Sequence, residues 1–124
     1  MRLLLDTHVV LWQLSGEREL SAPARKAIAA ADDLLFSVVS FAEVGIKASV
    51  GKLDVPDDLQ ERIADSGVRT LGLSPAHGLA VSDLPAHHRD PFDRLIIAQA
   101  MTEHLTVVTA DARFRDYGIE LLEA

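Results

Sequence analysis

Four carboxylates in this 124-residue chain follow short apolar runs or open a helix, and they are the residues best placed to do chemistry. They are Asp6, Glu43, Asp93 and Asp111. Two carboxylates about 4 Å apart repel by roughly 4 kcal/mol at an effective dielectric constant near 20. If the fold gathers all four, the cluster therefore requires bound protons or cations.

Oxygen ligands without sulfur favour Mg²⁺ or Mn²⁺ over zinc, and the chain contains no cysteine. Such ions leave coordination positions for a phosphate. Two of them about 3.5–4 Å apart can activate a water and stabilise the leaving oxygen of a phosphodiester. No glycine-rich phosphate loop is present, which argues against nucleotide-driven phosphoryl transfer. The residues alone predict metal-dependent phosphodiester cleavage, with the four carboxylates as metal ligands and catalytic groups.

The segment 87–100 predicts a loop followed by a buried helix, and Asp93 lies at the start of that helix. Asp90 can cap this helix and Pro91 fits its first position. The run 95–98 is apolar and covers most of the helix surface, so the helix is expected to be buried on several sides. A carboxylate at its mouth needs backbone amides, a cation or a metal.

Capping offers a structural alternative for the other carboxylates. Asp6 can cap the helix that follows it, an alternative that we weigh equally with a functional role. Ser40 and Glu43 fit a capping box, although a carboxylate has two oxygens and can also bind a metal. Asp90, before Pro91, is assigned to capping, with support of the metal site as its other possible role.

Strands and helices alternate along the chain, which predicts a three-layer α/β/α sandwich with a mostly parallel sheet of four to five strands. Right-handed crossovers place every strand-to-helix junction at one edge of such a sheet. Asp6, Glu43 and Asp111 share that edge by construction, and Asp93 can face it. The expected strands are 3–5, 34–39, 68–73, 105–109 and 118–122, and the expected helices are 8–14, 21–31, 40–50, 57–66, 75–83 and 91–100.

Length and composition predict one domain, residues 1–124, with a substantial core. Hydrophobic residues make up 48% of the chain, which argues against disorder. The formal net charge of −7 argues against a general nucleic-acid binder and suits a protein that binds cations. The apolar run at the N-terminus is too short for a signal peptide or a membrane span, so we expect a cytoplasmic protein without membrane contact.

In four segments the chain resembles the PIN-domain ribonucleases, and within them the VapC-type toxins of prokaryotic toxin–antitoxin pairs. The resemblance implies a Mg²⁺- or Mn²⁺-dependent endoribonuclease that cuts RNA and is inhibited by a cognate antitoxin. It also implies a homodimer or a toxin–antitoxin hetero-oligomer. The segments are residues 4–8, residues 40–53, residues 88–100 and residues 108–111.

Carried over by position, the resemblance implies a role for each acidic residue. Asp6 is the central metal ligand and Asp93 the second. Glu43 and Asp111 complete or adjust the site. Thr109 holds a carboxylate or a metal-bound water.

The remaining polar and aromatic candidates receive more ordinary roles. We favour a structural role for His8 over contact with substrate. For Trp12 and Phe41 we favour core positions over base-stacking platforms. Two histidines are expected to be loop residues, namely His87 and His88. Five basic residues either bind RNA phosphate or are ordinary surface charges, namely Lys47, Lys52, Arg89, Arg94 and Arg113.

Two other functions compete with the nuclease. A haloacid-dehalogenase-like phosphatase also places an aspartate after its first strand, but it needs a second aspartate where this chain has His8. A non-catalytic PIN-like module that only binds RNA or protein has no reason to bear the electrostatic cost of four clustered acids. We therefore favour the nuclease.

Overall fold

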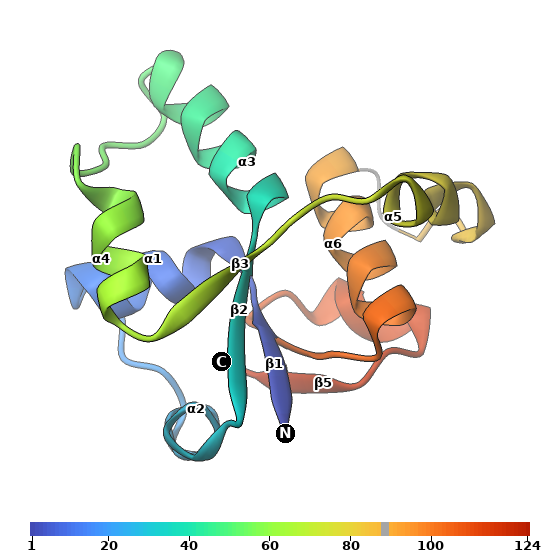
Figure 1. Ribbon diagram of the computed structural model, residues 1–124, viewed down its shortest axis with the longest axis horizontal. Coiled ribbons are helices and arrows are strands. Elements are labelled where there is room, and N and C mark those ends of the chain that lie inside the picture. The colour runs from blue at the N-terminus through green and yellow to red at the C-terminus, as the bar shows by residue number, and fades with distance from the viewer. Residues whose placement is uncertain (88–89) are drawn as a thin grey trace.

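A five-stranded, entirely parallel sheet forms the centre of the computed structural model, which describes residues 1–87 and 90–124 (Figure 1). The strand order is β3-β2-β1-β4-β5, so the predicted α/β class is confirmed. The elements in chain order are β1 (Arg2–Leu5), α1 (Thr7–Ser15), α2 (Ala22–Ala30), β2 (Asp33–Ser37), α3 (Val38–Ser49), α4 (Leu59–Asp65), β3 (Val68–Leu71), α5 (Pro75–Ala80), the short 3₁₀ helix η1 (Val81–Asp83), α6 (Pro91–Glu103), β4 (Thr106–Thr109), the 3₁₀ helix η2 (Ala112–Tyr117) and β5 (Leu121–Glu123).

Two hydrophobic cores, one on each face of the sheet, create the three layers. Leu3 and Leu5 of β1 belong to the core beneath α1, α2 and α4. Leu4 belongs to the opposite core, with Ile96 and Ile97 of α6. Figure 1 shows α1, α2 and α4 on one side of β1 and β2, with α5 and α6 on the other. A strand buried on both faces has no polar alternation, which explains the unbroken leucine run of β1.

Helix α3 begins earlier than the sequence predicts, and this corrects the assignment of Ser40. The cap is Ser37, whose side chain accepts a hydrogen bond from the Val39 amide at 3.0 Å. Ser40 therefore lies inside the helix, and the predicted capping box with Glu43 is wrong. The expected strand 34–39 accordingly ends at Ser37, where α3 extends beyond the sheet (Figure 1).

The other boundaries differ by a few residues. Helix α4 begins at Leu59 and strand β3 ends at Leu71, both shorter than predicted. Strand β5 forms the predicted edge of the sheet, beside β4. Among the described residues, no helix combines the length and the apolarity needed to cross a membrane.

Gln99 is a fully buried polar residue of α6 that ties this helix to the sheet. Its Oε1 accepts a hydrogen bond from the Ser37 hydroxyl at 2.5 Å, and its Nε2 donates to the Gly72 carbonyl at 3.2 Å. This contact fixes α6 against the carboxyl end of β2, where α3 begins. It therefore helps to set the position of the helix that carries Asp93.

Replacing Gln99 by methionine should lower the free energy of unfolding by about 2 kcal/mol, because the buried Ser37 hydroxyl loses its acceptor. Urea unfolding followed by circular dichroism measures this change. The matched control is Gln60→Met on the exposed side of α4, for which we expect a change within about 0.5 kcal/mol. Equal unfolding free energies for the two variants would contradict the assigned role of Gln99.

Candidate active site

Five carboxylates line one cavity of about 390 Å³ at the carboxyl edge of the sheet. They are Asp6, Glu43, Asp90, Asp93 and Asp111. The structure thus brings together the four acids named as site residues, together with the supporting Asp90. The parallel topology explains this, because the junctions after β1, β2 and β4 all open at the same edge.

Asp6 both caps a helix and faces the cavity, so the two alternatives for it coexist. Its carboxylate accepts hydrogen bonds from the Thr7 amide at 2.8 Å and from the Thr109 hydroxyl at 2.7 Å. Only 8% of the residue is exposed. Burial raises the pKa of the Asp6 carboxyl and the charge of Glu43 raises it further, although the bonds from Thr109 and Thr7 oppose the shift.

Thr109 links two of the acids through one hydroxyl. Its Oγ1 donates to Asp6 and accepts a hydrogen bond from the backbone amide of Asp111 at 3.0 Å. Of the two roles that the resemblance implied for Thr109, the structure shows the one of holding a carboxylate. The Asp111 side chain in turn receives two bonds from the Arg113 guanidinium, at 3.0 and 2.8 Å. Asp111 also caps η2.

Glu43 is buried on α3 and holds two partners from different directions. The Thr7 hydroxyl donates to its Oε1 at 2.7 Å, and Lys47 donates to its Oε2 at 2.7 Å. The Ser40 hydroxyl lies 2.8 Å from that of Thr7. The hydrogen bond to Glu43 raises the pKa of the Lys47 ammonium, as do the charges of nearby aspartates. Lys47 thus compensates part of the negative charge.

Asp93, in the first turn of α6, has a strongly raised pKa. Partial burial raises its pKa to about 8, together with the charges of the four other carboxylates. At neutral pH this carboxyl therefore carries a proton unless a cation replaces it. Asp90 caps the same helix as predicted, accepting from the Phe92 and Asp93 amides at 2.8 and 3.2 Å.

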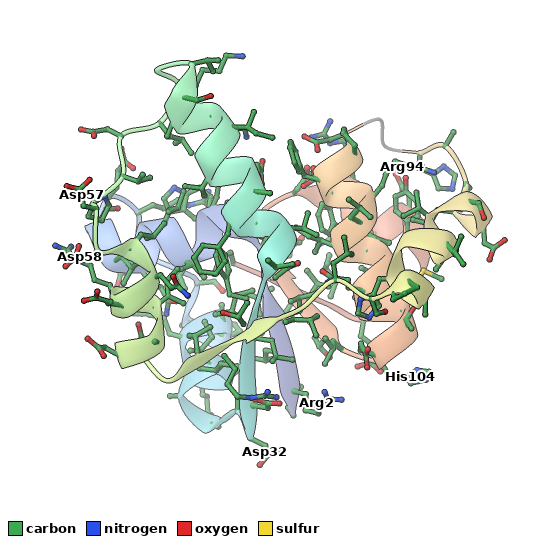
Figure 2. The ribbon with its side chains drawn as sticks, turned by 45° about the horizontal axis from the view of Figure 1, so that its top comes forward. Arg2, Asp32, Asp57, Asp58, Arg94 and His104 are labelled. Carbon is green, nitrogen blue, oxygen red and sulfur yellow. The ribbon has the colours of Figure 1, made fainter. Side chains whose placement is uncertain are left out.

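Arg94 holds the backbone beside the site. Its guanidinium donates to the carbonyl of Pro85 at 2.9 Å and to those of Val81 and Leu84 at 3.3 Å, and it lies 3.4 Å from the Tyr117 hydroxyl. Figure 2 shows Arg94 beside the segment that follows α5. The sequence left two roles open for Arg94, phosphate binding or an ordinary surface charge. The contacts show a third role, because the guanidinium links η1 and η2 to α6.

The histidines and aromatic residues divide between the site and the core. His8 is exposed and lines the cavity, so its side chain is not buried as the structural expectation assumed. Trp12 packs against the hydrophobic core, as expected, but it is half-buried and also lines the cavity. Phe41 packs edge-on against Phe36, as expected of the core. His87 lies against the ring of Tyr117, while the predictions for residues 88 and 89 fall outside the described residues.

A family model for the PIN domain matches residues 3–120 of this chain. The chain belongs to the PIN-domain family. Ribonuclease VapC22 of Mycobacterium tuberculosis is 32% identical to it over 118 residues, which covers 92% of this chain and 90% of that protein. The resemblance to VapC-type PIN domains that the sequence predicted is thereby confirmed.

Solved structures of the same fold include two toxin–antitoxin complexes. One is VapBC2 from Rickettsia felis bound to a DNA fragment from its promoter, with a TM-score of 0.75, 17% identity, and coverage of 99% of this chain and 98% of that one. The other is DNA-bound VapBC from Salmonella typhimurium, with a TM-score of 0.74, 16% identity and the same coverage. At these identities the likeness establishes the fold.

The PIN-domain cavity offers oxygen ligands, but its side chains are engaged with one another. Within residues 1–87 and 90–124, no three Asp, Glu or His side chains are arranged as they stand to hold a metal ion. Glu43 is turned to Lys47, and Asp111 is turned to Arg113. An incoming cation would therefore have to displace these ion pairs and the proton of Asp93.

The raised pKa of Asp93 predicts how the metal-free protein responds to pH. The folded pKa is about 8 and the unfolded value is near 3.9, so the unfolded chain loses this proton first as pH rises. The contribution of Asp93 to stability therefore falls between about pH 4 and pH 8. Asp93→Asn should remove this loss and raise the free energy of unfolding at pH 8 by about 1–2 kcal/mol, since water partly screens the half-buried group.

Denaturant unfolding in chelator at pH 5 and pH 8 measures this effect, and the stabilisation by Asp93→Asn should be larger at pH 8. The control is Asp57→Asn, because Asp57 is exposed beside α4 on the side opposite Arg94 (Figure 2). A destabilising effect of Asp93→Asn at pH 8 would show that the carboxyl is not strained in the metal-free protein.

Proposed function

We propose that this PIN domain is a Mg²⁺- or Mn²⁺-dependent endoribonuclease that acts in the cytoplasm as the toxin of a toxin–antitoxin pair. The observation that carries the proposal is the single cavity where carboxylates from four parts of a PIN-domain chain meet. A relative that is 32% identical over most of the chain is named a ribonuclease, which supports RNA as the substrate.

The donor set fits a hard divalent cation. The ligands we propose are Asp6, Glu43, Asp93 and Asp111, all of which offer oxygen. The charges of the neighbouring carboxylates already raise the pKa of Asp93, and a cation relieves that repulsion. When bound, Mg²⁺ or Mn²⁺ supplies a Lewis acid that makes water nucleophilic near neutral pH and neutralises charge on the phosphate.

The protein itself contributes orientation and charge balance. Thr109 and the Thr7 amide fix both oxygens of Asp6, so this carboxylate is positioned before any ligand arrives. Lys47 and Arg113 stand at the cavity and pair with acids there. If Glu43 and Asp111 held a metal ion, Lys47 and Arg113 would be released from these ion pairs and could bind phosphate oxygens of RNA.

The solved structures of the same fold support a protein partner for this chain. The two solved complexes are described as VapBC, and others of the same fold include a toxin–antitoxin complex from Klebsiella pneumoniae. We propose that a cognate antitoxin binds this chain and that the toxin forms a homodimer or a hetero-oligomer with it. Coexpression with the neighbouring reading frame and measurement of the complex mass test this part.

The alternative function is a non-catalytic PIN-like module that binds RNA or protein. The buried Asp6 and Glu43 argue against it, since a binding module gains nothing from burying two acids beside three others. A phosphatase of the haloacid-dehalogenase type needs a second aspartate directly after Thr7. This chain has His8 there, and His8 lines the cavity, so we reject that alternative.

Cleavage of a mixed RNA pool by purified protein tests the proposal. Wild-type protein should cut RNA with Mg²⁺ or Mn²⁺ and stop in chelator. Asp6→Asn and Asp93→Asn should each lower the rate by at least about a hundredfold, because each removes a metal ligand. Asp57→Asn should cut like wild type. Cleavage that survives in both site variants would reject the assigned ligands and indicate a contaminant.

Metal binding should also raise the melting temperature, because the ion binds only the assembled site. At a hundred times the dissociation constant the stabilisation is about 2.7 kcal/mol. Scanning calorimetry with and without Mn²⁺ measures this shift, which should shrink in Asp6→Asn. An unchanged melting temperature for the wild type would count against the carboxylate cluster as a metal site.

A further inference from the structure

Trp12 lies half-buried at the rim of the acidic cavity, and metal chemistry does not account for it. It lies one helical turn after His8 on α1, so the two rings share a helix face. Their centroids are 5.8 Å apart and their planes are tilted by 45°. Both rings line the cavity together with Asp6 and Asp93.

The same two rings border a second hollow, of about 250 Å³. Its other walls include apolar side chains that follow α3, such as Leu53 and Val55. Trp12 also borders a third hollow, of about 490 Å³, which is lined by Arg18 and by the ion pair of Arg25 with Glu19. The indole is therefore a wall that the acidic cavity shares with an apolar hollow and with a hollow of mixed charge.

Arg18 covers part of the indole. Its guanidinium carbon lies 4.3 Å from the centroid of the Trp12 ring, within the range of a cation–π contact. This contact helps to fix the orientation of the ring. We refer to His8, Trp12 and Arg18 as the aromatic shelf.

A nucleobase is the part of an RNA chain that suits the aromatic shelf. A base is uncharged and presents a flat face that stacks on an aromatic ring such as the indole at this cavity. Bases within a duplex are already stacked and paired, so an unpaired base is the one that can be turned onto a protein ring. In the hollow beyond Trp12, Arg18 is the cation nearest to the ring, since Arg25 is paired with Glu19 there.

We propose that the aromatic shelf is a base-stacking subsite, which holds an unpaired nucleotide beside the phosphate to be cut. The inference rests on the proposed ribonuclease function and assigns to Trp12, supported by His8 and Arg18, the binding of the base next to the bond that is cut. The second hollow, with its apolar wall, accommodates the edge of the stacked base.

Fluorescence gives a direct test, because Trp12 is the one tryptophan in the sequence. The Asp93→Asn variant, which leaves RNA uncut, is titrated with Mg²⁺ and a pool of short unpaired RNA, while RNA binding is followed separately by anisotropy of a label. Unpaired RNA should quench the tryptophan in step with binding. Ribose-phosphate chains without bases and fully paired duplexes should quench it weakly. Binding of unpaired RNA without quenching would overturn the proposal.

Two variants separate stacking from packing. Trp12→Leu keeps an apolar side chain and should raise KM for unpaired RNA by about tenfold with little change in kcat. Trp12→Phe keeps an aromatic face and should recover most of that loss. Melting temperatures confirm that both variants are folded. Equal KM values for wild type, Trp12→Leu and Trp12→Phe would overturn the stacking role.

The experiments distinguish a failure of the base-stacking subsite from a failure of the proposed ribonuclease function. If wild-type protein cuts no RNA under any metal condition, the ribonuclease proposal fails and takes the inference with it. If wild type cuts RNA but Trp12→Leu cuts it with unchanged KM, the subsite alone is rejected. Loss of antitoxin binding in Trp12→Leu with unchanged KM for RNA would also reject it, by assigning the shelf to a protein partner.

Discussion

Crowding of negative charge at one edge of a parallel sheet is the constraint on which the rest of this structure depends. Five carboxylates face a single cavity, and two of them, Asp6 and Glu43, are buried. Partial burial of Asp93, together with the charges of the four other carboxylates, raises its pKa to about 8. Four side chains at this edge, Thr7, Thr109, Lys47 and Arg113, compensate part of that cost, and they help to define the geometry of the site.

The compensation is divided between fixed and exchangeable partners. Thr7 and Thr109 contact buried acids through short hydrogen bonds from the strand ends, and they cannot leave without disturbing β4 or α1. Lys47 and Arg113 pair with acids through longer, partly exposed side chains, which can swing away. In such a site the Asp6 carboxylate is held in place before a ligand binds, whereas the partners of Glu43 and Asp111 can change. That combination suits an ion that must be bound and a charged substrate that must enter and leave.

The sequence predicts the sheet and its acidic edge because those features follow from local rules. A leucine run followed by Asp6 identifies a central strand and its junction, since parallel strands are buried on both faces. Other features depend on distant residues. Ser37 and Ser40 both satisfy the local rule for a cap, and the choice is linked to Thr7, which contacts Ser40 and Glu43 from another helix. The partners of Arg94 are backbone carbonyls, which carry no signal in the sequence. Helical periodicity places His8 and Trp12 on one face but does not reveal that this face meets the cavity.

Net charge and substrate present the remaining physical problem, because an acidic protein of charge −7 is proposed to bind a polyanion. Electrostatic attraction over the whole surface cannot supply the affinity. Affinity must therefore come from local sources that do not depend on net charge: a cation at the carboxylates, the two basic side chains beside it, and stacking on an uncharged ring. Stacking loses little at physiological ionic strength, whereas phosphate contacts weaken as salt rises. An acidic PIN domain with an indole at its cavity should consequently depend less on salt, and more on unpaired bases, than a basic RNA-binding surface does.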